Sequence, residues 1–333
     1  MKKAKPVLIL IMKVLVSGGL LVFFFTRIHI ERFLHTLAAA DFSYVAVALV
    51  VYLVAQFIAA LRWTILAWPL GFDTRYKDFS LYYLIGMFFN LFGPSTVGGD
   101  VTRVYYLARD GQKEREKGWA TSTVPAAVSV FMDRAVGMAV LVWLGAAGLA
   151  LFPYYPVPSP IRSLTFALSL ALIAAGLLVP VLRRVLPNDG HPIVVKLGVA
   201  MSAYRDHWGV IPQAIVLSFV LHLVQAWIHL LMGKALQINV PFSFCIILYP
   251  LVGTFAALPV SLNGIGLREG GYLFLLGLLG INPEKAIAFG LLVFLIVAMD
   301  SLIGGLLFLL KKSPKPANEV LAKPISSGSR EIK

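Results

Sequence analysis

The chain has 333 residues, of which 59% are hydrophobic and only 14% are charged, and its mean hydropathy is +0.84. This composition excludes an ordinary water-soluble domain and indicates a protein embedded in lipid. The net charge of +13 does not indicate nucleic-acid binding, because the basic residues lie in loops between apolar runs and no soluble domain remains to bind nucleic acid. The single Cys245 gives no disulfide, metal or redox signature.

Six apolar runs are long enough to cross a membrane as helices, since about 20 helical residues span the hydrocarbon core. They lie at about 7–26, 42–62, 119–152, 163–182, 210–233 and 286–310. The first run is interpreted as a span of the mature protein, because it has no small-x-small cleavage site and contains Lys13.

Two further apolar regions, at about 79–108 and 243–282, are interrupted in the middle by polar and helix-breaking residues. The first interruption runs from Asn90 to Arg103 and the second from Pro259 to Gly271. In a bilayer, irregular backbone with charges is tolerated only where it lines a protein-enclosed or water-filled cavity. Two such breaks at corresponding positions are typical of a transport site.

The distribution of basic residues decides between a re-entrant hairpin and a single crossing for each interrupted region. With the N-terminus inside and both regions re-entrant, 21 of the 29 basic residues lie inside. A single crossing would move dense basic loops such as 109–117 outside. The positive-inside rule therefore favours two hairpins, with both termini cytoplasmic and the chain in the inner membrane.

The two halves of the chain share one plan of elements. Each half has, in order, a span, a short amphipathic piece (Ile28 to Ala40 or Pro187 to Trp208), a span, a hairpin and a span. The segment 131–137 also matches the segment 298–304, at an offset of 167 residues. Because each half crosses the membrane three times, an odd number, the second copy is inverted relative to the first. The sequence thus predicts an all-α polytopic membrane protein with about six full transmembrane helices plus two re-entrant helical hairpins, organised as inverted repeats at 1–153 and 162–311 and a basic cytoplasmic tail at 312–333.

The motifs resemble those of a flippase-like membrane family named for the transmembrane region of lysylphosphatidylglycerol synthetase. The resemblance rests on Asn-x-Phe-x-Pro-Ser-x-x-Gly-Gly-Asp-x-x-Arg at 90–103, on Asn-Gly-x-Gly-x-Arg-Glu-Gly at 263–270 and on Leu-Arg-Trp at 61–63. It covers about residues 7–310. Only about twenty residues follow Leu310, so we expect the lipid-translocating half of such a synthetase without its soluble aminoacyl-transfer domain.

The two interruptions are the predicted substrate site. Arg103 and Arg268 are expected to face each other and to clamp a phosphate, while Asp100 and Glu269 receive an ammonium group, a sugar hydroxyl or a proton. The alternative is that each acid only pairs with its neighbouring arginine. Glycines allow backbone N–H groups and a helix N-terminus to approach an anion. The predicted substrate-binding residues are Asn90, Pro94, Ser95, Gly98, Gly99, Asp100, Arg103, Asn263, Gly264, Gly266, Arg268 and Glu269.

Four further charges lie within apolar spans and are candidates for an intramembrane charge or proton relay. Asp133 and Arg134 are neighbours, and an interhelical ion pair that holds the fold together is the alternative to a functional role. Asp300 is the better candidate for a proton carrier, because no adjacent cation neutralises it. Arg62, at the inner end of its span, is expected to snorkel to lipid phosphates.

Several other patterns are interpreted without a catalytic role. His222, Gln225 and His229 share a helix face and indicate hydrogen-bonded packing instead of a metal site. The glycines at 264–270 follow no strand, which excludes a dinucleotide loop. No Walker motif or Ser-His-Asp order occurs. The sequence therefore predicts no cofactor and no metal.

We expect a lipid flippase-like transporter that binds or translocates an anionic or lipid-linked headgroup, such as an aminoacyl-phospholipid or a polyprenyl-phosphate glycolipid. The alternatives are a membrane-embedded transferase acting on a lipid phosphate and an accessory subunit of an envelope-lipid synthase. Membrane lipids are the expected partners, and an envelope-lipid synthase or a glycosyltransferase is a further candidate partner. Nucleic acid is not an expected partner. The sequence leaves open whether the protein forms oligomers.

Overall fold

The computed structural model describes residues 18–19, 26, 29–92, 98–113, 123–185, 202–258, 261 and 264–311. These residues form helices joined by short turns, without a strand among them, which confirms the all-α fold class. The predicted first span lies almost entirely outside this part of the chain, as do most of the amphipathic piece at 187–208 and the tail at 312–333.

Five helices are long and apolar enough to cross a membrane. They agree within a few residues with five of the predicted spans, except that α3 runs further than expected. The helices are α3 (Phe42–Ala67), extended by the 3-10 turn η1 (Trp68–Leu70), α6 (Thr123–Leu151), α7 (Ser159–Val185), α9 (Val210–Ala235) and α12 (Pro283–Leu310). The chain is therefore a multi-pass membrane protein.

Each interrupted region forms a pair of short helices. The pairs are α4 (Tyr76–Phe92) with α5 (Gly98–Lys113), and α10 (Phe242–Ala256) with α11 (Leu267–Gly277). Their 17, 16, 15 and 11 residues fall short of the roughly 20 that a full crossing needs. Within each pair the helices pack against each other. That these pairs are re-entrant hairpins, and the membrane side on which each opens, stay predictions.

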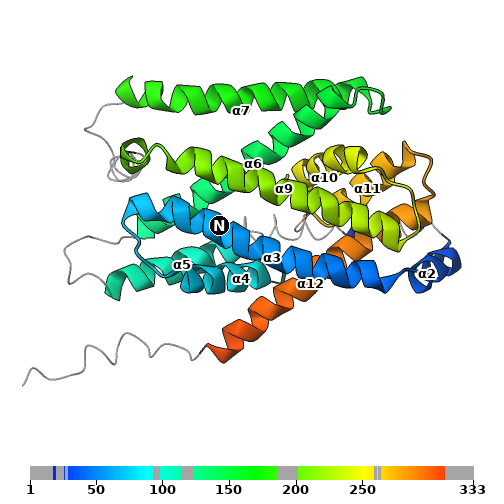
Figure 1. Cartoon of the computed structure of the whole chain (residues 1–333), viewed down its shortest axis with the longest axis horizontal. Coiled ribbons are helices and arrows are strands. Elements are labelled where there is room, and N and C mark those ends of the chain that lie inside the picture. The colour runs from blue at the N-terminus through cyan, green and yellow to red at the C-terminus, as the bar shows by residue number, and fades with distance from the viewer. Residues whose placement is uncertain are drawn as a thin grey trace, which may run out of the picture.

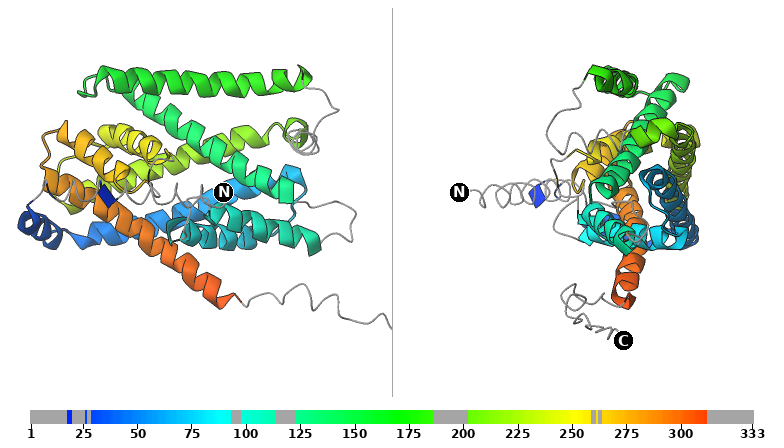
Figure 2. Two further views of the ribbon diagram at one scale, coloured as in Figure 1. Left: turned by 180° about the vertical axis from the view of Figure 1, so that it is seen from behind. Right: turned by 90° about the vertical axis from the view of Figure 1, so that its left-hand side faces the viewer.

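The short helices and the spans pack in matched sets, and α3 and α9 lie side by side on one face of the bundle (Figures 1 and 2). Helix α4 packs on α12 as α10 packs on α6, and α5 packs on α6 as α11 packs on α12. Helix α7 lies along one edge of the bundle beside α6 (Figures 1 and 2). Inverted repeats require such matched neighbours, although the repeat and its boundaries stay predictions.

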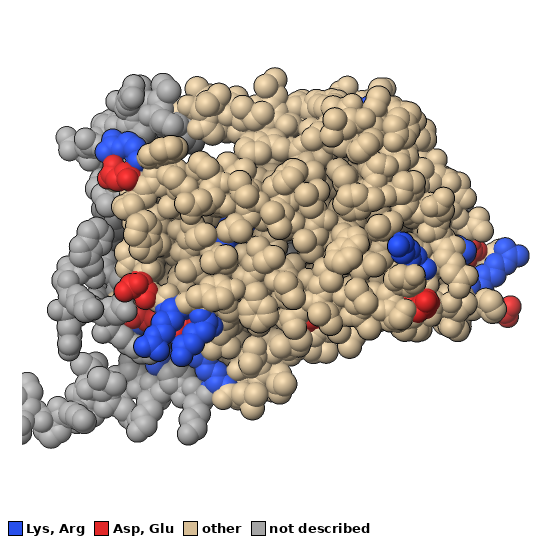
Figure 3. Space-filling model, viewed as in Figure 1, with Lys and Arg blue, Asp and Glu red and all other residues tan. Residues whose placement is uncertain are grey.

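Charged side chains gather at the two ends of the long axis, and the face between them is apolar (Figure 3). At one end the amphipathic helix α2 (Ile30–Ala38) falls within the predicted piece at 28–40 and packs against α12. At that same end Asp41 caps α3, and hydrogen bonds from the Ser43 backbone and hydroxyl lower the pKa of its carboxyl group. This distribution of charge suits a bundle whose helices cross a bilayer.

Glycines allow α4 and α12 to approach closely. A Cβ atom added to Gly304 would lie only 2.6 Å from the carbonyl carbon of Leu84. We expect Gly304→Ala to destabilise the protein by roughly 1–3 kcal/mol, because backbone on the facing helix would have to move. Thermal unfolding in detergent measures this loss. Gly176→Ala on α7 is the matched control, because nothing lies within 4 Å of an added Cβ there; equal melting of both variants would contradict the prediction.

Candidate functional site

A cavity of about 330 Å³ lies between α3, α4, α5, α6, α9 and α12. Its walls combine apolar side chains with the densest group of charges inside the bundle. The residues of the first interruption that contribute are Asn90, Leu91 and Arg103, whereas the second interruption contributes none of the described lining. The polar lining residues are Tyr52, Gln56, Arg62, Tyr83, Asn90, Arg103, Asp133, Arg134, His222 and Ser301.

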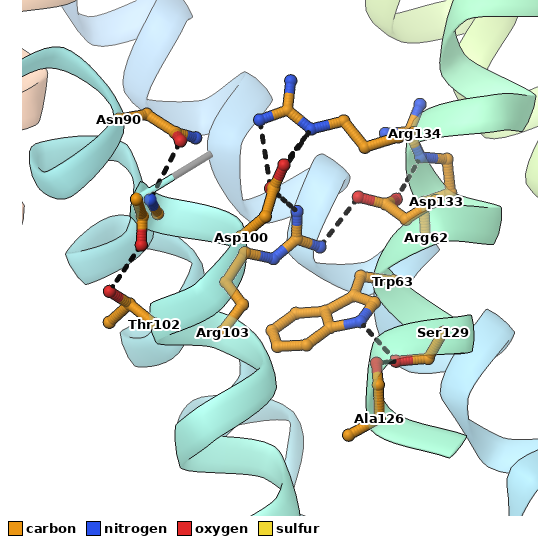
Figure 4. A network of polar contacts seen from close by, with 12 residues as sticks. Arg62, Trp63, Asn90, Asp100, Thr102, Arg103, Ala126, Ser129, Asp133 and Arg134 are labelled. Carbon is orange, nitrogen blue, oxygen red and sulfur yellow. Dashed lines mark hydrogen bonds and ion pairs between the residues drawn. The ribbon is translucent and has the colours of Figure 1, made fainter. Parts of the chain in front are cut away.

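Asp133 on α6 is the centre of this group of charges (Figure 4). Its Oδ1 lies 2.8 Å from Nε of Arg62, and its Oδ2 lies 2.7 Å from a terminal nitrogen of Arg103. The Asp133 side chain is 1% exposed. Arg62 donates a further hydrogen bond of 2.9 Å to Ser218 on α9. One carboxylate thus joins α3, α5 and α6, and through Arg62 it reaches α9.

This geometry corrects one prediction. Arg62 does not snorkel to lipid phosphates: its side chain is 7% exposed and is held by Asp133. The reason is that α3 continues to Ala67 and η1, so Arg62 lies inside the span and not at its end. Asp133 and Arg134 form interhelical ion pairs, as the structural alternative expected. Their partners differ, because consecutive residues on a helix point in directions about 100° apart.

Arg134 pairs instead with Asp100 at the start of α5. Its Nε lies 3.2 and 3.1 Å from the two carboxylate oxygens, and a terminal nitrogen lies 3.0 Å from Oδ1. Asp100 is also 3.7 Å from Arg103, three residues further along the helix. The Arg134 side chain is 54% exposed, so its guanidinium lines the cavity while remaining accessible.

Arg103 is enclosed by aromatic rings as well as by carboxylates. Its guanidinium carbon lies 4.1 Å from the ring centroid of Trp63 and 4.6 Å from that of Tyr83. Trp63 is fixed by a hydrogen bond of 3.1 Å from its indole nitrogen to Ser129. Cation–π contacts strengthen when they are removed from water. Arg103 is therefore rigidly placed, and the aromatic partners were not predicted from the sequence.

The first cluster, defined as Arg62, Asp100, Arg103, Asp133 and Arg134, has three positive and two negative side chains. Every member has an ion-pair partner within the cluster. The cluster nevertheless carries a surplus of one positive charge beside the cavity. A buried surplus charge is costly unless a counter-ion joins it, so the cavity is suited to an anionic group.

The first interruption positions this cluster by bringing α4 and α5 together. The backbone N–H of Gly99 donates to the side-chain oxygen of Asn90 at 3.0 Å, and a Cβ on Gly99 would overlap the backbone carbonyl of Gly86. Gly98 is equally close to the facing helix, since an added Cβ would lie 2.9 Å from the Phe89 carbonyl oxygen. The predicted Pro94 and Ser95 lie outside the described residues.

Comparison with known proteins gives the family. The sequence pattern of the family described as the lysylphosphatidylglycerol synthase TM region matches residues 10–304. The chain belongs to this family. It is also similar to the UPF0104 membrane protein MJ1595 of Methanocaldococcus jannaschii, with 32% identity over 98 residues. That match covers 29% of this chain and 29% of the relative. The relative is named as a membrane protein, and its name gives no activity.

In this member of the synthase TM-region family, the second interruption is built differently from the first. Gly264 and Gly266 have φ values of 75° and 87°, which favour glycine. The Glu269 carboxylate accepts from the Gly266 backbone at 2.7 Å and from Arg268 at 2.8 Å. Glu269 therefore closes the turn, and Arg268 stacks on Phe294 with 4.9 Å to the ring centroid. Asn263 lies outside the described residues.

Asp300 on α12 contrasts with Asp133, which lies 167 residues earlier in the chain. It is 0% exposed, and neither carboxylate oxygen has a hydrogen-bond partner among the described residues. The adjacent Ser301 lines the cavity, and its hydroxyl also has no partner in this part of the structure. The second half therefore holds a buried acid where the first half holds an acid paired with two arginines.

The histidines of α9 serve packing, as predicted. His222 contacts the Tyr249 hydroxyl and the Gly137 carbonyl, each at 2.9 Å. His229 contacts the Tyr272 hydroxyl and the Gln225 carbonyl, each at 2.7 Å. The described residues contain no group of three metal-ligating side chains. These hydrogen bonds join α9 to α6, α10 and α11.

Proposed function

We propose that this protein binds the anionic headgroup of a membrane lipid in the cavity of the first cluster and translocates the lipid across the inner membrane. One observation supports this above all: three arginines face only two carboxylates beside a cavity of about 330 Å³. A phosphate would neutralise the surplus charge, and planar guanidinium groups recognise phosphate oxygens in pairs.

Arg134 is the residue best placed to meet the headgroup. Its side chain is half-exposed and lines the cavity, whereas Arg62 and Arg103 are buried against Asp133. The buried arginines supply a fixed positive field, and Arg134 supplies free hydrogen-bond donors. A pre-formed field of this kind needs little rearrangement when the anion arrives.

An apolar groove of about 360 Å³ lies along α4 and α12 and is assigned to the lipid tail. The same two helices contribute to the cavity: Leu91 and Val297 face the cavity, and Phe89 and Leu306 face the groove. We assign an acyl or polyprenyl chain to this groove because its lining is apolar. The groove is lined by Phe88, Phe89, Leu302, Gly305, Leu306, Phe308 and Leu309.

We expect Leu306→Trp to reduce lipid translocation about ten-fold without unfolding the protein. The indole ring would fill the groove, and Leu306 is 57% exposed, so no core packing is lost. The measurement is the initial rate of translocation in liposomes, with thermal stability recorded in parallel. Leu170→Trp on α7, 68% exposed, is the matched control. Equal rates for both variants would remove the groove from the lipid path.

Translocation follows from the two hairpins if they move relative to each other. Transporters with inverted repeats expose a midplane site alternately by rocking one repeat against the other. We place the termini in the cytoplasm from the charge distribution. In this proposal the α4–α5 hairpin brings Asp100 and Arg103 to the cavity, and the α10–α11 hairpin forms the opposing side of the bundle.

The test is a reconstitution that compares headgroups. Purified protein in phosphatidylcholine liposomes is given fluorescent phosphatidylglycerol or fluorescent phosphatidylcholine, and dithionite quenching reports which leaflet the probe occupies. We expect protein-dependent movement of the anionic probe at least ten-fold faster than that of the zwitterionic probe. Protein-free liposomes give the background rate. Equal rates for the two probes, or no rate above background, would contradict the proposed function.

A further inference from the structure

We propose that Asp300 is a proton-binding site that couples lipid movement to the movement of one proton in the same direction. This inference rests on the proposed function, because it requires an anionic headgroup at the first cluster. It adds the driving ion and the stoichiometry. The observation behind it is the absence of a hydrogen-bond or ion-pair partner for Asp300 among the described residues, although the side chain is fully buried.

A buried carboxyl group in this position is stable only in its neutral form. Removing an ionised carboxylate from water costs several kcal/mol when no cation or donor compensates it. Asp133 shows how the same fold compensates a permanent charge, with two arginines at 2.8 and 2.7 Å. Asp300 has no such arrangement in this conformation. It is therefore protonated here, and it loses its proton in a conformation that admits water to it. The ionised form is then stable only if the rearrangement brings a surplus arginine of the first cluster to it.

Among the described residues, the elements packed on α12 give Asp300 no ion-pair or hydrogen-bond partner. Helices α2, α3, α4, α9 and α11 pack against α12, and their ionisable side chains inside the bundle include Tyr52, Arg62, Tyr83, His222, His229, Arg268 and Glu269. Tyr52 interacts electrostatically with Asp300. The charged groups and the two histidines have partners of their own: Asp133 holds Arg62, Glu269 holds Arg268, Tyr249 holds His222, and Tyr272 holds His229. Helix α2, with His35, packs near Glu284, about 24 Å along α12 from Asp300.

Charge balance gives the stoichiometry. The first cluster has a surplus of one positive charge, and the Arg268–Glu269 pair is neutral. With Asp300 protonated, binding a monoanionic headgroup brings the total to zero. With Asp300 ionised, the total is zero without the headgroup. Moving a net charge through the bilayer is unfavourable. The protein can therefore switch the side of the membrane to which the cavity opens only in these two neutral states.

The transport step then balances in charge and in protons. A proton from water on one side binds a carboxylate oxygen of Asp300, and a lipid anion binds the first cluster from the same side. After the change of exposure, the lipid leaves and the proton returns to water on the other side. The ionised Asp300 replaces the lipid as the counter-charge for the surplus arginine during the return. One proton and one anion move together, and no net charge crosses.

The first experiment detects the proton on Asp300 without any lipid substrate. Infrared spectroscopy of the full-length protein in detergent should show the C=O stretch of a protonated carboxyl group at pH 7. We expect this band to disappear in Asp300→Asn and to persist in Glu284→Gln, which removes a half-buried carboxylate in the first turn of the same helix. The His229→Gln variant should also keep the band. A band that Asp300→Asn leaves intact would overturn the assignment.

The second experiment measures coupling in liposomes that contain a pH-sensitive dye and receive fluorescent phosphatidylglycerol. Wild type should move lipid and protons in a 1:1 ratio, respond to an imposed pH gradient, and ignore a membrane potential set by potassium and valinomycin. Asp300→Asn should still bind the probe and exchange it between leaflets, but net movement and proton flux should fall at least ten-fold. His229→Gln should retain the coupling.

The outcomes separate this inference from the proposed function. If wild type binds and moves the anionic probe but Asp300→Asn does so equally well, the coupling is wrong and the proposed function stands. Lipid movement that follows the membrane potential, or that stops when choline replaces sodium, also overturns the coupling. If wild type does not bind the probe although the infrared band is present, the proposed function fails and the coupling fails with it.

Discussion

Replacing Asp133 with asparagine is expected to destabilise the folded protein by roughly 3–5 kcal/mol, because it leaves the buried Arg62 without a counter-charge and Arg103 with only the more distant Asp100. Asp133 lies 2.8 Å from Arg62 and 2.7 Å from Arg103. The three side chains are at most 7% exposed, so water cannot replace the lost carboxylate. Because these contacts join α3, α5 and α6, the loss should spread through the bundle.

Thermal unfolding in detergent and the yield of monodisperse protein measure this effect. The matched control is Asp300→Asn, which makes the same substitution 167 residues further on, at a carboxyl group without a partner among the described residues. That variant should melt close to wild type, because an amide resembles the neutral acid. Equal destabilisation of the two variants would show that the Asp133 ion pairs do not hold the bundle together.

The sequence predicts the helices of this protein well because each signal is local. An apolar run of about 20 residues has few alternatives to a spanning helix, and glycine with proline inside such a run interrupts it. Both pairs of short helices follow from this logic. The position of Arg62 shows the limit, because the apolar run was taken to end at this charged residue, whereas α3 continues to Ala67.

The partners of the charged residues could not be predicted in the same way. Asp133 and Arg62 are 71 residues apart, and which arginine reaches which carboxylate depends on how three helices cross. The sequence singled out the residues of the first cluster and offered interhelical ion pairs as an alternative role for Asp133 and Arg134, but it did not name their partners. Helix rotation was a usable signal here, since Arg134 and Asp133 cannot both point at one partner.

The two interruptions also differ in a way that their similar composition did not reveal. Both offered an arginine beside an acid, and the sequence placed Arg103 and Arg268 on opposite sides of one site. In the structure Glu269 both caps the turn at Gly266 and holds Arg268. A side chain three residues after a glycine turn is well placed to cap a helix start, and this signal favoured the structural alternative for Glu269.

Replacing Arg134 with glutamate is expected to weaken binding of anionic lipid by about 100-fold or more. The change turns the first cluster from one surplus positive charge to one surplus negative charge. Removing the charged hydrogen bonds alone should weaken binding by roughly 10- to 100-fold, from about 1.5–3 kcal/mol. Arg134→Gln, which leaves the cluster neutral, should therefore lie between wild type and Arg134→Glu. The measurement is titration of the detergent-solubilised protein with phosphatidylglycerol.

The exposure of Arg134 makes this series informative, because a side chain that is 54% exposed can change without emptying a packed core. Arg205→Glu is the matched control: it makes the same change of charge at a residue that is 77% exposed and distant from the cavity lining. Binding that depends only on overall charge would fall equally in both variants and would recover in high salt. Binding inside the cavity should fall only in the Arg134 variants, and salt should restore little of it, because a partly enclosed cluster is weakly screened.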